Sequence, residues 1–286
     1  MSSTAETFQS KATGTNDAGF PLWLRQIGAI LRLELKKNFF GKRSLLVYLL
    51  ALMPVALLVL VEIVNPLGRD SNQLPSIYSV FYNSLILRTV VFFGCAWIFM
   101  NLFRGEIVDR SLHYYFLSSV RREVLVTGKY LSGLLTSILL FTTVTVVCML
   151  LVFFAHFFSS SSRFFLDGQG FSQLFWYVTI TMLACVGYGA FFLVVGLFFR
   201  NPIIPALLLY GWEWINFLLP PLLKKISVIH YLNSLVPVPI SEGPFAVVAE
   251  PTPAWISIPG LLIVTALVLI AASSRIHRME IRYGSD

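Results

Sequence analysis

The chain has 286 residues, of which 57% are hydrophobic and only 12% are charged, and its formal net charge is +7. Soluble domains carry about 25% charged residues, so this composition excludes a soluble enzyme, a disordered protein and a secreted disulfide scaffold. It predicts an all-α integral membrane protein, provided that the apolar residues form runs of about 20 residues.

The N-terminal segment is expected to reach the membrane before the first span begins. Residues 1–20 are polar and rich in Ser and Thr, which is typical of a disordered cytoplasmic tail, and they show no signal peptide. From Pro21 to Phe40 apolar residues recur every three or four positions. This pattern predicts an amphipathic helix, in a segment of residues 21–43, that lies in the membrane interface. Arg25, Arg32 and Lys36 share its polar face, and the helix either anchors the chain or carries force into the first span.

Six apolar runs predict six transmembrane helices within residues 44–275. The runs are Leu45–Val61, Val80–Phe103, Tyr130–Phe158, Phe171–Phe199, Ile203–Leu223 and Pro251–Ser274.

Most of the 21 Lys and Arg residues precede the first run, separate the second from the third, or follow the last. Cytoplasmic loops carry this excess, so both termini, including the tail of residues 276–286, are expected in the cytoplasm. In a prokaryote the membrane would be the cytoplasmic (inner) membrane. The positive charge therefore indicates orientation in a lipid bilayer, and no nucleic-acid partner is expected.

Two charged residues interrupt these predicted spans. Arg88 lies in the second and Glu213 in the fifth, at similar depths, and charge inside a span is costly unless it is paired or functional. We expect the two side chains to face each other, either as a packing salt bridge or as part of a gate or substrate contact. Asn83 and Asn216 would join such a polar pathway, although core packing explains each of them equally well.

Residues 222–254 form the longest loop on the outward side. The loop combines apolar residues with several Pro and Gly residues, which break any continuous helix. We expect short helices that enter the outer leaflet part of the way, as a re-entrant loop before the last span. Backbone groups freed by such breaks must be buried against protein rather than lipid.

The loop of residues 104–129, on the cytoplasmic side, contains a short run of apolar and aromatic residues between polar ones. The core of the run is Leu112, Tyr114, Tyr115 and Phe116. Exposed apolar patches of this kind usually meet a partner, while the alternative is a helix that lies flat on the membrane.

The order of these features resembles the permease subunits of ABC-2 type ATP-binding cassette transporters. In that family an acidic residue, a Thr/Ser-Leu step, an apolar helix and an Arg before Gly-Lys occupy this loop. The matching residues here are Glu106, Ser111-Leu112, Tyr114–Leu117, Arg122 and Gly128-Lys129. The stretch Ala29–Lys37, which contains Glu34, also looks like the family, as does Arg43-Ser44 before a Pro-containing first span. The resemblance covers residues 22–275. It departs from the family at His113–Phe116, where many members have Leu. This difference leaves open which groove of the partner would receive the helix.

The resemblance implies a permease subunit of an exporter that is not itself an enzyme. It would pair with a second permease copy or a paralogue, and with ABC ATPase subunits that bind ATP and Mg²⁺. A short cytoplasmic coupling helix at about Ser111–Ser118 would dock on the ATPase, flanked by Glu106, Asp109, Arg121 and Arg122.

The sequence agrees with ATP binding by a separate subunit, because it contains no GxxxxGK[ST] phosphate loop. No cofactor is therefore expected on this chain. No metal site is expected either, since Cys95, Cys148 and Cys185 lie in apolar stretches without a nearby His. The alternatives are an intramembrane enzyme and an ATP-independent transporter or channel. The chain has no HExxH or GxSxG motif and no clear inverted repeat.

Overall fold

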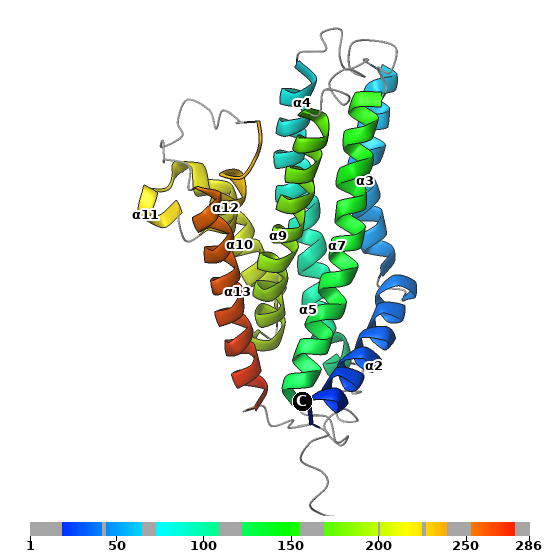
Figure 1. Cartoon of the computed structure of the whole chain (residues 1–286), viewed down its shortest axis with the longest axis vertical. Coiled ribbons are helices and arrows are strands. Elements are labelled where there is room, and N and C mark those ends of the chain that lie inside the picture. The colour runs from blue at the N-terminus through cyan, green and yellow to red at the C-terminus, as the bar shows by residue number, and fades with distance from the viewer. Residues whose placement is uncertain are drawn as a thin grey trace, which may run out of the picture.

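The structure, a computed structural model, describes residues 19–41, 44–64, 73–108, 122–154, 169–199, 201–224, 227–238 and 253–277. Nearly all of these residues are helical and none lies in a strand, which confirms the predicted all-α class (Figure 1). The elements in chain order are α2 (Gly19–Phe40), α3 (Ser44–Val64), α4 (Leu74–Phe81), the π-helix η3 (Tyr82–Val91), α5 (Phe92–Val108), α7 (Arg122–Phe154), α9 (Gln169–Phe198), α10 (Ile203–Ile215), the 3₁₀-helix η4 (Asn216–Leu218), α11 (Pro221–Lys224), α12 (Val228–Asn233) and α13 (Ala254–His277).

Five helical stretches are long and apolar enough to cross a bilayer. They are 44–64, 74–104, 124–153, 169–198 and 254–272. They correspond to the predicted first, second, third, fourth and last spans, so the chain has the character of a multi-pass membrane protein.

The fifth predicted span, Ile203–Leu223, is not a continuous helix. Helix α10 ends at Ile215 after 13 residues, which at 1.5 Å per residue is about 20 Å, against about 30 Å of hydrocarbon. The chain then makes the 3₁₀ turn η4 and becomes extended at Leu219, with ψ of 147°. A residue before proline is pushed out of the helical region, so the pair Pro220-Pro221 explains why the helix stops. Hydropathy alone did not detect this break, because apolar residues continue on both sides of Asn216.

The second span begins earlier than its hydropathy predicted. Helix α4 starts at Leu74 rather than Val80, with Pro75 in its first turn, a position that proline favours. Two of its polar residues, Tyr78 and Ser79, are accommodated by burial, since they are 1% and 0% exposed. The Tyr78 hydroxyl donates to the Thr145 carbonyl oxygen at 2.9 Å. Tertiary partners therefore extend this span beyond its apolar core.

Helix α9 is the centre of the bundle and packs against α5, α7 and α13. By contrast, only 22% of the α3 span and 17% of the α13 span are buried, against 61% for α9. The exposed side chains of α3 and α13 are almost all aliphatic, which suits contact with lipid.

Helix α2 confirms the helix predicted for Pro21–Phe40 and packs along α7 (Figure 1). Arg25, Arg32 and Lys36 are exposed, as their shared spacing predicted. Gly41 follows the end of α2, and a Cβ at this position would collide with the Lys37 carbonyl oxygen. This position thus requires glycine.

The described start of α2 and the end of α13 lie at the same end of the bundle, together with the end of α5 and the start of α7 (Figure 1). This arrangement agrees with the side on which the sequence placed the basic segments. The predicted coupling helix at Ser111–Ser118 and most of the two predicted tails lie outside the described residues.

Candidate functional site

Among the buried polar groups of the bundle, two clusters contain charged side chains. The first, named here the Lys129 cluster, consists of Glu34, Leu102, Lys129 and Ser132. The second, the Glu213 cluster, lies around the short helix α12. It consists of Asn83, Arg88, Glu213, Trp214, Ser227, the first backbone amides of α12, and Asn233.

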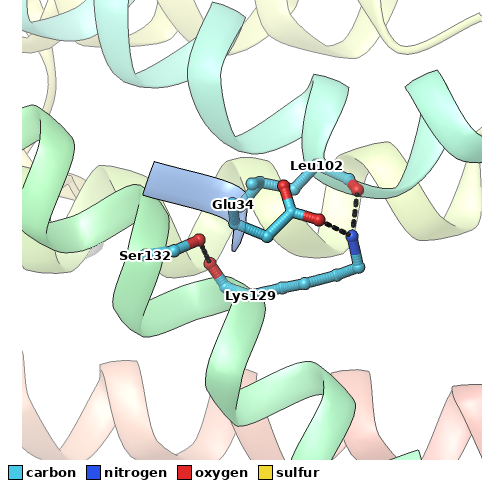
Figure 2. A network of polar contacts seen from close by, with 4 residues as sticks. All are labelled: Glu34, Leu102, Lys129 and Ser132. Carbon is cyan, nitrogen blue, oxygen red and sulfur yellow. Dashed lines mark hydrogen bonds and ion pairs between the residues drawn. The ribbon is translucent and has the colours of Figure 1, made fainter. Parts of the chain in front are cut away.

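Lys129 joins three helices at one point (Figure 2). Its side chain, on α7, is 0% exposed, and Nζ donates to Glu34 Oε1 of α2 at 2.7 Å. The same Nζ donates to the Leu102 carbonyl oxygen of α5 at 3.0 Å and lies 5.4 Å from the centroid of the Phe103 ring. The Ser132 hydroxyl in turn donates to the Lys129 carbonyl oxygen at 2.7 Å. A buried lysine therefore has both a counter-charge and a second acceptor, which burial of a charge demands.

Close packing of α2 on α7 brings the two charged residues together. Gly128 faces Ile30 so closely that a Cβ would lie 3.0 Å from Ile30 Cγ2. Glu34 follows Ile30 by one helical turn and therefore lies on the same face of α2, opposite the exposed basic residues. Glu34 lies on α2 with Arg25, Arg32 and Lys36, as expected, but unlike those three residues it is only 1% exposed and belongs to the protein core.

The Lys129 cluster lies close to the segment that was expected to act as the coupling helix. Helix α5 ends at Val108 and α7 begins at Arg122, and Leu102 and Lys129 are each about two turns or less from those ends. Most of the predicted coupling residues fall in 109–121, outside the described residues: Asp109, Ser111, Leu112, Tyr114, Tyr115, Phe116 and Arg121. Glu106 and Arg122 lie on α5 and α7, but their side chains are not described.

Glu213 holds the start of α12. Its side chain, on α10, is 3% exposed, and its two carboxylate oxygens accept three hydrogen bonds. The donors are the Ser227 hydroxyl at 2.6 Å, the Val228 N–H at 3.1 Å and the Ile229 N–H at 3.1 Å. The first N–H groups of a helix have no partner within the helix, and negative charge is favoured there. Glu213 thus satisfies backbone donors that would be costly to leave unpaired in an apolar region.

The opposite charges of Arg88 and Glu213 act on each other, but the two side chains form no direct ion pair among the described residues. Arg88 Nε donates instead to Asn83 Oδ1 at 3.3 Å, and the guanidinium carbon lies 5.8 Å from the centroid of the Trp214 ring. The physical reason is local. Asn83 and Arg88 both lie in the π-helix η3, whose i to i+5 geometry aligns residue 83 with residue 88. The Glu213 carboxylate already accepts hydrogen bonds from the first backbone N–H groups of α12.

Asn83 also connects η3 to the far end of α12. Its Nδ2 donates to Asn233 Oδ1 at 3.0 Å, and the nearby Ser79 hydroxyl donates to the Val238 carbonyl oxygen at 2.8 Å. Helix α12 is therefore held at its start by α10 and at its end by the second span. The predicted residues Asn83 and Arg88 are brought together here, and Glu213 lies at the other end of the same short helix.

Asn216, the fourth predicted polar residue, lies at the start of η4 and is 5% exposed. Its Nδ2 has no hydrogen-bond partner within the part of the chain that the structure describes.

Sequence reasoning missed Ser227, Asn233 and Trp214. Ser227 offered a signal, since serine before a short apolar run is a typical N-cap. No pattern pointed to Asn233, whose partner is 150 residues away.

Across the described ranges no group of three or more His, Cys, Asp or Glu residues could hold a metal ion. Cys95, Cys148 and Cys185 are buried in the bundle core. The chemistry that both clusters offer is therefore that of charge and hydrogen bonding between helices. A scan against protein-family models and a search of curated proteins found no match for this chain.

Proposed function

We propose that this chain is the transmembrane permease subunit of an ABC-2 type exporter, driven by separate ATPase subunits that dock on the 104–129 loop. The observation that carries the proposal is the Lys129 cluster. It ties the amphipathic helix α2 to both helices that flank residues 109–121, by hydrogen bonds of 2.7 and 3.0 Å.

The physical problem in such a transporter is the transmission of movement. An ATPase that closes in the cytoplasm would displace the 109–121 segment, and the movement must reach the spans. Because Lys129 bridges α2, α5 and α7 near that segment, these helices would move as one body, and α5 and α7 continue directly into two spans. Tyr115 and Phe116 would supply most of the docking energy, because the exposed charge pairs of the loop contribute only about 0–1 kcal/mol each.

The outward half of the proposed pathway lies around the Glu213 cluster. Helix α10 together with η4 and α11 would form an interrupted fifth of six spans, and residues 222–254 would form the re-entrant loop. Breaks in a span are tolerated where protein satisfies the freed backbone groups, and Glu213 does so for α12. Arg88, half-buried and beside Trp214, is the cation that we propose faces the transported molecule.

The proposal is tested by co-purification with a candidate ABC ATPase encoded beside this chain. The double variant Tyr115→Ala/Phe116→Ala is expected to lose ATPase association while it still inserts into the membrane. A matched double variant, Phe171→Ala/Phe175→Ala, removes two exposed aromatic rings of α9, 63% and 66% exposed, from the other end of the bundle. It should co-purify normally. Normal co-purification of the first variant, or substrate turnover by the purified chain without any ATPase, would contradict the proposal.

A further inference from the structure

A cavity of about 230 Å³ lies where the end of α2, the start of α3 and the middle of α5 meet. Its lining includes Lys37, Asn38, Ser44, Val47, Trp97 and Ile98. The volume is smaller than the roughly 300–1,000 Å³ of typical drug-sized pockets, but it is several times the roughly 30 Å³ that a water molecule occupies. The cavity therefore suits a group of headgroup size.

The polar part of the lining offers hydrogen-bond donors. Asn38 Nδ2 is buried and has no hydrogen-bond partner among the described residues. Lys37 adds a positive charge at the exposed surface of the same helix end. Glu34 also lines the cavity, but its Oε1 is bound to Lys129, so that pair contributes no net charge. A buried amide donor without a partner, next to a lysine, favours an anionic oxygen group such as a phosphate.

The position of the cavity points to the source of that group. The exposed basic residues of α2 suit the level of lipid headgroups, and the cavity is at the end of this helix. The adjoining α3 exposes Leu45 and Leu49, which are 71% and 70% exposed, next to the cavity residues Ser44 and Val47. A phosphate bound in the cavity would thus lie beside an apolar helix face along which acyl chains can pack. Trp97 is also of the type that is enriched at headgroup depth.

We propose that this cavity binds the phosphate group of a membrane phospholipid, with Asn38 Nδ2 and Lys37 Nζ as donors and the acyl chains along α3. The inference requires the chain to be embedded in a membrane, but it does not depend on the proposed transport function. A bound lipid would join α2 to α3 and α5, next to the Lys129 cluster, whose Glu34 and Leu102 also line the cavity.

The experiment measures binding of phosphatidylglycerol to the purified full chain in detergent, by native mass spectrometry and by the shift in the midpoint of thermal unfolding. Lys37→Gln and Asn38→Leu are each expected to weaken binding about tenfold, because each removes a hydrogen bond to a charged group. Lys36→Gln is the matched control, since it removes the same charge from a neighbouring exposed residue that does not line the cavity. It should change the affinity by less than about twofold.

Two further ligands separate the possible sources of the bound group. Diacylglycerol lacks the phosphate and glycerol phosphate lacks the acyl chains, and both are expected to bind at least tenfold more weakly than phosphatidylglycerol. Equal binding of diacylglycerol, equal binding of glycerol phosphate, or an equal loss in Lys36→Gln and Lys37→Gln would each overturn the proposal. If Asn38→Leu does not fold, Val47→Phe gives the same test, because it fills the cavity from α3. Unchanged affinity in Val47→Phe would also overturn the proposal.

Discussion

At the scale of single residues, the buried charges are the most informative part of this chain. Hydropathy identifies Arg88 and Glu213 because each interrupts an apolar run, but it does not say which groups form hydrogen bonds or ion pairs with them. Glu213 is satisfied by Ser227 and two backbone amides of α12, and Arg88 by Asn83. Glu34 and Lys129, which no hydropathy argument singled out, form a buried ion pair with a distance of 2.7 Å.

The Glu34–Lys129 pair leads to a prediction about stability. Lys129→Met should lower the free energy of unfolding by about 3–5 kcal/mol, because it leaves the Glu34 carboxylate buried without a counter-charge. The double variant Glu34→Leu/Lys129→Met should recover most of that loss, since apolar replacement of a buried pair is often neutral. Denaturant unfolding in mixed micelles measures both values. Lys36→Met, at an exposed lysine of α2, is the control and should change the value by less than about 0.5 kcal/mol. A double variant as unstable as Lys129→Met would contradict this account of the pair.

At the scale of elements, close approach of helices depends on small residues at particular positions. Gly189 and Gly196, two turns apart on α9, face α5. A Cβ at Gly189 would lie 2.5 Å from Phe99 Cζ, and one at Gly196 would lie 2.9 Å from the backbone Cα of Met100. In membranes such small residues let helix backbones pack closely, which is a main source of helix association there.

The variant Gly196→Ala is therefore expected to destabilise the protein by about 1–3 kcal/mol, because the backbone of Met100 cannot move aside as a side chain could. Gly211→Ala on α10 is the matched control, since nothing lies within 4 Å of its Cβ position. It should stabilise its helix by up to about 1 kcal/mol, through the higher helix propensity of alanine. The midpoints of thermal unfolding in detergent compare the two. A loss of the same size in both variants would show that the α5–α9 contact is not the cause.

At the scale of the whole molecule, the described helices form an up-and-down bundle in which the outer helices α3 and α13 expose most of their apolar surface (Figure 1). The described start of α2 and the end of α13 lie at the same end. We propose that this end faces the cytoplasm, because Lys and Arg are concentrated in the segments at that end and basic residues are retained on the cytoplasmic side during insertion.

Single cysteines introduced near the termini and in the loop after α7 test this orientation. Ser161→Cys should react with a membrane-impermeant maleimide in intact cells, whereas Ser10→Cys and Ser285→Cys should react only after permeabilisation. The three native cysteines are buried, so an unmodified chain serves as the background control. Reaction of either terminal cysteine in intact cells, with Ser161→Cys protected, would reverse the predicted orientation.

Much of the fold follows from local sequence, because a bilayer of fixed thickness requires about 20 apolar residues per helix and such runs are visible without knowledge of any contact. That requirement fixes the all-helical class and five of the spans, and the recurrence of apolar residues every three or four positions predicts helix α2. The polar residues Asn83, Arg88, Glu213 and Asn216 stand out by the same argument, because each one is out of place in an apolar run. The break after Ile215 was missed because both sides of it are equally apolar.

Only the tertiary structure decided which polar groups meet. Lys129 and Glu34 are 95 residues apart, and Asn83 and Asn233 are 150 apart. Their pairing depends on which helix faces pack together. The size of side chains at contact positions such as Gly128, rather than the polar residues themselves, decides which faces can approach each other. A buried charge must find a partner in any fold, so the sequence determines that a partner exists, and the packing of the helices determines which residue it is.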